Sequence, residues 1–274
     1  MTRIGSRAAI GRRMVVIACA VAFGLSLSAC SSGTSSVTPP AQPHIPPFTY
    51  VALGGSESVG YDANDPVRQA FTVELERQLP RQTVFYDLGA PETNSTDVLE
   101  DQVPTALSLH PNLVTVWVGL SDLEGGVSAG EYGARLKQIL GRLRATHAQV
   151  LVANIEPITL APVYLSCLGQ PASTVNPRND RCFVDQFFPS GSLPPVAQAS
   201  AAIAAYNLEV ASVVRSTGAT LVDISSAMSG TSVHAGQLFS SHDFDLSTTG
   251  HELAARLFGE AWRAARSRSA SANL

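Results

Sequence analysis

Short β-rich runs alternate with helical patterns between residues 49 and 265, and this alternation limits the fold more than any other feature of the chain. Strands that alternate with helices form parallel sheets with helices on both faces. We therefore predict an α/β fold, a three-layer α/β/α sandwich with a parallel five-stranded sheet. The predicted strands are Thr49–Leu53, Thr83–Leu88, Leu113–Val118, Gln149–Ala153 and Thr220–Ile224.

Five helices are predicted between and after these strands, and apolar residues at helical spacing are clearest in the last two. The predicted helices are Val67–Gln78, Ser95–Gln102, Ala129–Ala145, Pro195–Ser216 and Ser247–Ala265. The proline-rich stretch 157–194 has no clear period and is predicted to be a long insertion near the C-terminal edge of the sheet. Ligands bind at the carboxyl ends of parallel strands. The loops of interest therefore begin at Gly54, Gly89, Gly119, Asn154 and Ser225.

The first 29 residues have the pattern of a secretory signal. A basic segment that ends at Arg13 precedes an apolar run over residues 14–27, an order typical of a removable leader. The small residues before Cys30 resemble the bacterial lipobox, in which the cysteine is lipidated and becomes the first residue. This resemblance implies a protein exported across the cytoplasmic membrane and anchored by lipid at the cell surface or the periplasmic face. A plain signal cut elsewhere and an uncleaved anchor are the alternatives, although a spanning helix needs about 20 apolar residues.

Composition divides the remaining chain. Residues 31–48 combine Ser, Thr and Pro without an apolar period, so they cannot fold alone and are predicted to be a spacer. We expect residues 30–48 to hold the lipidated cysteine and the tether, residues 49–267 to form one domain, and residues 268–274 to be a C-terminal tail. Hydrophobic residues make up 45% of the chain and charged residues 15%, which is enough for a large core and excludes a disordered chain.

The charge of the chain excludes nucleic acid as a partner, and its cysteines predict one disulfide. The leader holds four of the 18 basic residues and no acidic one, which leaves 14 basic against 22 acidic residues, a net charge of −8. Such a chain does not attract nucleic acid. Cys19 leaves with the leader and Cys30 takes the lipid, so only Cys167 and Cys182 remain. In an oxidising compartment we expect them to pair; two free buried thiols are the alternative.

The loop after the first predicted strand carries a family resemblance. It reads Gly54-Gly55-Ser56, with Gly60 four residues further on. The chain here resembles the SGNH (GDSL) hydrolase family, whose first block is a strand that ends in Gly-Asp-Ser with a glycine four residues later. The resemblance implies a serine ester hydrolase with Ser56 as the nucleophile, flanked by glycines that let backbone approach a substrate. The alternative is that Ser56 only caps the following turn. Further matching fragments are Tyr86-Asp87-Leu88-Gly89, Val116-Trp117-Val118-Gly119-Leu120-Ser121-Asp122, Ala205-Tyr206-Asn207, Leu221-Val222-Asp223 and Thr249-Gly250-His251.

The blocks that would form the oxyanion hole depart from the family pattern. Gly55 replaces the aspartate of the first block. The resemblance implies donors from the serine N–H, a second-block glycine and a third-block asparagine. Glu92 stands where that glycine usually is, unless Gly89 supplies the N–H, and Ser121 replaces the asparagine. A serine hydroxyl reaches less far than an asparagine amide, and Glu92 would bring negative charge to a developing oxyanion. Both changes argue against fast catalysis.

The last block exchanges its two catalytic residue types. The family ends in Asp-x-x-His before its Gly-His, with the histidine as general base and the aspartate orienting it. Counting back from Gly250, Asp245 falls at the base position and His242 at the orienting position. A carboxylate (pKa ~3.9) is a much weaker base than an imidazole (pKa ~6.5). Two alternatives remain: the loop turns His242 toward Ser56, with Asp243 or Asp245 orienting it, or burial raises the pKa of Asp245 enough to make it a slow base.

No cofactor and no metal are expected. His242, Asp245 and His251 match no zinc spacing, and His251 is predicted to be structural. The loop 54–60 fits neither the dinucleotide fingerprint nor the P-loop. The expected function is that of a surface-anchored SGNH-type serine hydrolase with an altered site, acting on a small-molecule or glycan ester. The alternatives are an inactive protein of this fold that binds an acyl or glycan ligand, and a structural protein without a pocket.

Overall fold

Five parallel strands form the central sheet of the computed structural model, which describes residues 47–169, 182, 188–189, 191–231 and 233–272. The strand order is β2-β1-β3-β4-β5, and every neighbouring pair is parallel. Each strand lies within two residues of a predicted run, so the predicted sheet is confirmed. The strands are β1 (Phe48–Gly54), β2 (Thr83–Asp87), β3 (Leu113–Trp117), β4 (Gln149–Ala153) and β5 (Thr220–Val222).

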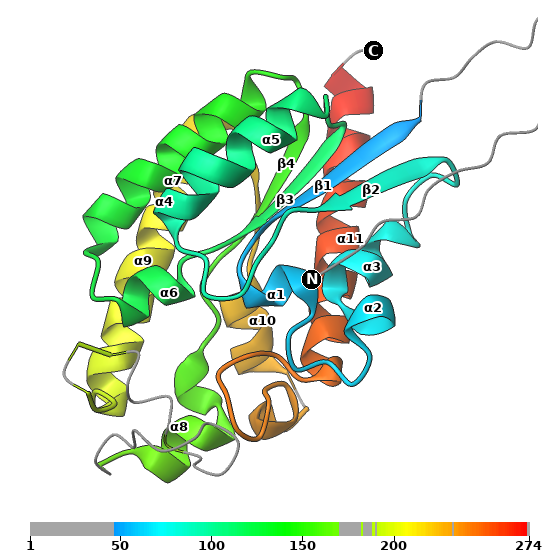
Figure 1. Ribbon diagram of the computed structural model, residues 1–274. Coiled ribbons are helices and arrows are strands. Elements are labelled where there is room, and N and C mark those ends of the chain that lie inside the picture. Colours follow the sequence, from blue (N-terminus) through cyan, green and yellow to red (C-terminus); the bar gives the residue numbers. More distant parts are fainter. Residues whose placement is uncertain (1–46, 170–181, 183–187, 190, 232, 273–274) are drawn as a thin grey trace, which may run out of the picture. The chain divides into compact units, whose positions relative to one another are not determined.

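Helices cover both faces of this sheet (Figure 1). One face carries α2 (Pro66–Gln69), α3 (Phe71–Glu76) and α11 (Thr248–Ala272), and the other carries α5 (Val103–Ser108), α7 (Ala129–Arg144) and α9 (Val196–Thr217). Aromatic rings join the first helical layer to the sheet, because Phe71 and Phe258 stack at 4.8 Å and both rings contact Trp117 of β3. The predicted three-layer architecture is therefore confirmed.

Three helices differ from their predicted ranges. The predicted helix Val67–Gln78 is divided into α2 and α3 at Ala70, whose ψ of 141° is extended. The predicted helix Ser95–Gln102 consists of α4 (Ser95–Asp97) and a π-helical turn (Val98–Gln102), and the chain stays helical through α5. The last helix, α11, continues to Ala272, so residues 268–272 of the predicted tail are helical.

Short helices and one cross-link complete the described structure. The helices α1 (Ser56–Val59), α6 (Leu120–Glu124), α8 (Pro162–Cys167) and α10 (Ile224–Gly230) are too brief to show a helical period in the sequence. Cys167 and Cys182 form a disulfide, with Cα atoms 5.2 Å apart. The predicted pairing is confirmed, and the alternative of two free thiols is wrong.

Several predictions concern residues outside the described ranges. These are the leader, the lipidation site at Cys30, nearly all of the tether, and residues 170–181, 183–187 and 190 of the predicted insertion. None of the described helices combines the length and the apolar character that crossing a membrane requires.

Candidate active site

A cavity of about 490 Å³ lies at the carboxyl ends of β1 and β3. The strand order reverses between these two strands, since β2 lies on one side of β1 and β3 on the other. Ligands of open α/β sheets bind at such a switch point. Four segments line the cavity, residues 55–61, 91–93, 118–125 and 243–245. The described residues thus leave a pocket at the predicted strand ends, which argues against a purely structural protein.

Ser56 lines the cavity as the first residue of α1. Gly54, before it, has a φ of +143°, and a Cβ at this position would lie 1.9 Å from the carbonyl oxygen of Trp117. Only glycine permits this approach of β1 to β3. The N–H of Gly54 donates to Gln102 Oε1 at 2.9 Å, and the N–H of Gly55 donates to the Trp117 carbonyl oxygen at 3.2 Å. The turn that presents Ser56 is therefore firmly held.

Asp245 is the residue of the last loop that meets this serine. Both side chains line the cavity, and the Ser56 hydroxyl is close enough to favour the ionised form of the Asp245 carboxylate. Burial raises the pKa of Asp245 well above its ordinary value, and the charges of Asp243 and Asp62 raise it further, whereas the hydroxyl of Ser56 lowers it. A carboxylate with a raised pKa is a stronger base than one in water. Of the two sequence-based alternatives, this contact matches the one with Asp245 beside the nucleophile.

The side chain of His242 lies outside the cavity. Its side chain is 61% exposed, with Nε2 3.5 Å from Asp62 Oδ1. Its Nδ1 lies 3.3 Å from Ser240 Oγ and 3.4 Å from Ser241 Oγ. His242 is not among the residues that line the cavity. The structure therefore does not bring His242 to Ser56, and neither Asp243 nor Asp245 orients its imidazole toward that serine.

The two predicted oxyanion donors differ in position. Ser121 lies in α6 and lines the cavity. Its helix is anchored by Asp122, whose carboxylate accepts hydrogen bonds from the N–H of Ser95 at 2.7 Å and from its hydroxyl at 2.6 Å. Gly89 does not line the cavity, and its N–H donates to Asp87 Oδ1 at 3.0 Å. The N–H of Gly89 is therefore already used, because the side chain two residues earlier folds back onto it.

Glu92 occupies the cavity wall where the family has glycine. Its φ is +60°, in the left-handed region that glycine favours. The backbone thus keeps the conformation that a glycine would adopt, although the side chain is that of a glutamate. The backbone N–H of Ser56 has no acceptor within the described ranges.

A buried pair of carboxyl groups beside the cavity was not found from the sequence. Glu57 is 5% exposed and Glu156 is 1% exposed, and their side chains are hydrogen-bonded to each other. Trp117 Nε1 donates to Glu156 Oε2 at 3.0 Å. Burial raises the pKa of both groups, and the charge of Glu156 raises that of Glu57 further. Burial and the neighbouring charge of Glu156 therefore both favour the protonated form of Glu57 over its ordinary ionised form.

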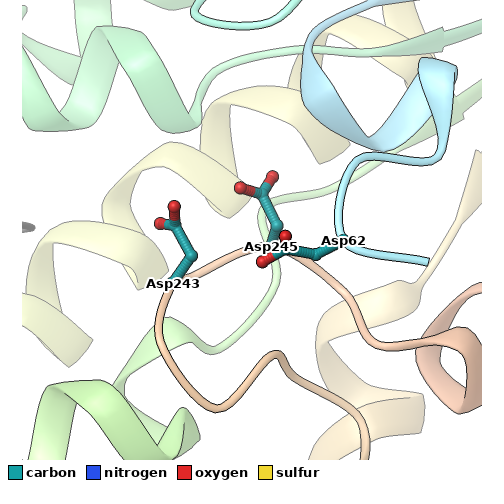
Figure 2. A group of neighbouring side chains, drawn as sticks. All are labelled: Asp62, Asp243 and Asp245. Atoms are coloured by element: carbon teal, nitrogen blue, oxygen red, sulfur yellow. The ribbon is translucent and has the colours of Figure 1, made fainter. Parts of the chain in front are cut away.

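Asp62 lies close to two of the cavity-lining carboxylates, those of Asp243 and Asp245 (Figure 2). Figure 2 shows Asp243 and Asp245 on the loop before α11 and Asp62 on the segment after α1, and one oxygen from each lies within 4.8 Å of the others. Carboxylate oxygens are ligands of Ca²⁺ and Mg²⁺, but a Ca²⁺ site takes six to eight oxygens. Asp245 is beside Ser56 and Asp62 faces His242, so we assign no metal to the group.

His251 has a structural environment. It is fully buried, its Nε2 lies 3.3 Å from the carbonyl oxygen of Tyr61, and burial lowers its pKa to about 4. It is therefore neutral at physiological pH. His251 is thus buried whereas His242 is exposed, and the group of possible metal ligands found among the described residues includes neither.

The sheet, its switch-point cavity and the serine after β1 define an α/β protein of the SGNH-hydrolase fold. The model of the GDSL-like lipase/acylhydrolase family matches residues 52–253, and the chain belongs to this family. The chain has no match among curated proteins.

Solved structures with the same fold are distant in sequence. LAE5, an α/β hydrolase enzyme from the metagenome of Lake Arreo, Spain, is 17% identical with a TM-score of 0.56 over 78% of this chain and 94% of that chain. The lipase/acylhydrolase from Enterococcus faecalis is 15% identical with a TM-score of 0.54, over 78% and 94%. A mutant of Axe2, an acetyl-xylooligosaccharide esterase from Geobacillus stearmophilus, is 13% identical with a TM-score of 0.55, over 77% and 92%.

Proposed function

We propose that the chain is a serine ester hydrolase of the esterase or lipase class, with Ser56 as the nucleophile and Asp245 as its proton acceptor. The observation that carries the proposal is that Ser56 and Asp245 are neighbours in the wall of an open cavity, where the Ser56 hydroxyl favours the ionised carboxylate. A serine hydroxyl attacks a carbonyl carbon only when an adjacent base takes its proton. Membership of a family of lipases and acylhydrolases supports this reaction class.

The proposed reaction has two halves. Ser56 Oγ bonds to the carbonyl carbon of the ester while its proton moves to Asp245. The bond to the alcohol oxygen then breaks, and the alcohol leaves with that proton. In the second half a water molecule gives a proton to Asp245 and attacks the acyl-serine, which releases the acid and returns the proton to Ser56. The N–H of Ser56 and the hydroxyl of Ser121 would donate to the oxyanion.

We expect slow turnover. A carboxylate remains a weaker base than an imidazole even with a raised pKa. The N–H of Gly89 is bonded to Asp87, and Glu92 brings negative charge to the cavity wall. Loss of one oxyanion donor typically costs about 3 kcal/mol of transition-state stabilisation.

The test uses the full chain, purified in detergent, with p-nitrophenyl acetate as substrate and a fluorophosphonate as label. Ser56→Ala is expected to abolish labelling and hydrolysis, and Asp245→Asn to lower both by about a hundredfold or more. His242→Ala is the matched control, because its exposed side chain lies outside the cavity, and it should keep the wild-type rate. Equal labelling of the Ser56→Ala variant would refute the assignment of the nucleophile. A loss in His242→Ala as large as in Asp245→Asn would make His242 the base.

A second function is favoured by the altered oxyanion donors. A protein with the N–H of Gly89 already bonded and Glu92 in the wall could hold an acylated ligand without hydrolysing it. The fold similarity to an acetyl-xylooligosaccharide esterase makes a glycan ester one ligand to test. Absence of turnover and of labelling in a folded sample, together with calorimetric binding of an acetylated xylooligosaccharide, would support this function.

We also propose that a lipid on Cys30 anchors the protein outside the cytoplasmic membrane. The support is the order of the leader, in which a basic segment, an apolar run and small residues precede the cysteine. In a bacterial host fed radioactive palmitate, the chain should incorporate label and partition into detergent, and Cys30→Ala should do neither. Equal labelling of the variant would overturn the anchor at this position.

A further inference from the structure

The lining of the cavity is acidic on every side. Five lining residues carry a carboxyl group, and none of the lining residues is a lysine, an arginine or a histidine. They come from four separate segments of the chain, so the charge is not a property of one loop. The acidic lining residues are Glu57, Glu92, Glu124, Asp243 and Asp245.

This negative charge lacks counter-charge. The ion pairs of the described residues that involve arginine use other acids, such as Asp65, Glu74 and Asp122. None of the five cavity acids is paired with a basic side chain in the described part of the chain. Uncompensated carboxylates in a cavity are costly, and a cationic ligand would offset that cost.

The pKa values of the cavity acids agree with the lack of a basic partner. Burial raises the pKa of Glu124 well above its ordinary value, and the charges of Asp243 and Asp245 raise it further. Burial also raises the pKa of Asp243, with the charge of Asp62 adding to it. A positive charge in the cavity would lower the pKa of both Glu124 and Asp243.

The rest of the lining suits an alkylated ammonium group. The ring of Tyr61 lines the cavity and is 45% exposed, so its face is open to a cation. Val118, Leu120 and Phe244 supply apolar surface for methyl groups. Aromatic and aliphatic contacts combined with carboxylates are the pattern that binds quaternary ammonium ions rather than small hydrated metal ions.

We propose that this cavity selects esters that carry a positively charged alkylammonium group over uncharged esters of the same shape. The reaction of these esters rests on the function proposed above, whereas the charge preference is a property of binding and is testable without turnover.

The test compares acetylcholine with its uncharged isostere, in which a tert-butyl group replaces the trimethylammonium group. The full chain with Ser56→Ala is titrated with each ester by isothermal calorimetry, in EDTA so that no divalent cation competes. Acetylcholine should bind at least about tenfold more tightly at low ionic strength, and added salt should reduce this advantage. Equal affinities, or tighter binding of the isostere, would overturn the proposal.

A matched pair of variants assigns the preference to the cavity. Glu124→Gln removes a lining charge and should lower the ratio of the two affinities about three- to tenfold. Glu100→Gln makes the same change at an exposed position outside the cavity and should leave the ratio unchanged. Equal effects of the two substitutions would refute the role of the lining.

Hydrolysis by the wild-type chain separates the two proposals. The ratio of kcat/KM for the two esters should follow the ratio of affinities. If the uncharged ester is hydrolysed through Ser56 as fast as acetylcholine, the hydrolase function stands and the charge preference is wrong. If neither ester is hydrolysed, the hydrolase function is wrong and the calorimetry still decides the preference.

Discussion

At the scale of single residues, the site depends on how closely two strands approach. Gly54 lets the end of β1 pack against the carbonyl group of Trp117, and this contact orients the turn that carries Ser56. The sequence predicted that Ser56, Ser121 and Asp245 lie at the strand ends, because a family pattern marks them. It did not predict Glu57 and Glu156, since their pairing depends on the distance between the ends of β1 and β4, which no local pattern encodes.

Gly54→Ala is expected to destabilise the fold by about 3 kcal/mol or more. The added Cβ would meet the Trp117 carbonyl oxygen at 1.9 Å, and the φ of +143° is unfavourable for alanine. Urea unfolding followed by circular dichroism measures the loss. Gly130→Ala is the control, because a Cβ in that exposed turn of α7 meets nothing within 4 Å. It should stabilise the chain by up to about 1 kcal/mol. Similar effects of the two substitutions would contradict the steric argument.

His251 should make the free energy of unfolding depend on pH. Burial lowers its pKa from 6.5 to about 4 in the folded state. Its contribution is therefore fully present above pH 6.5 and is lost as the pH falls toward 4, because only the unfolded chain takes up the proton in that range. The loss amounts to about 3 kcal/mol at pH 4. His251→Gln cannot titrate, so its stability deficit relative to wild type should shrink between pH 6.5 and pH 4. A deficit that stays constant would mean that His251 titrates normally.

At the scale of elements, long periodic segments were predictable and short ones were not. The helices α7 and α9 lie within one residue of their predicted ends, because their apolar faces repeat over several turns. The helices α1 and α6, which carry Ser56 and Ser121, are too short for such a repeat. The break at Ala70 was also missed. No glycine or proline marks this position in the sequence, and the segment after it, α3, packs against α11.

The Cys167–Cys182 disulfide should stabilise the chain through its unfolded state. It closes a loop with a sequence separation of 15, which limits the unfolded chain by about 3 kcal/mol in the chain-entropy account. Replacement of both cysteines by serine should lower the free energy of unfolding by up to that amount. Reducing agent should destabilise the wild-type chain and leave the double variant unchanged. A double variant as stable as the oxidised wild type would contradict the prediction.

At the scale of the whole molecule, negative charge is concentrated at one place in the fold. Loops that follow different strands bring acids to the same cavity, although these acids are far apart in the sequence. Composition gives the net excess of acid, but only the strand order determines where the acids meet. The fold class was therefore accessible from the sequence, whereas the electrostatic character of the site was not.

Deprotonation of a buried carboxyl group should lower the stability of the chain as the pH rises. Burial raises the pKa of Asp87 to about 6. A carboxyl group with a raised folded-state pKa contributes stability that is fully present below its unfolded value and is lost as the pH rises through the folded value. The melting temperature of the wild type relative to that of Asp87→Asn should therefore fall as the pH is raised from about 4 to about 6, measured by scanning fluorimetry. A difference that rises over this range would contradict the assignment.

The left-handed backbone at Glu92 has an evolutionary consequence. Glycine codons and glutamate codons can differ by a single nucleotide, and the chain already has the dihedral angle that glycine favours. One point mutation would therefore remove the negative charge of this side chain from the cavity wall without any rearrangement of the surrounding loop. Natural relatives with glycine here and relatives with glutamate should therefore alternate among closely related branches rather than form two ancient groups.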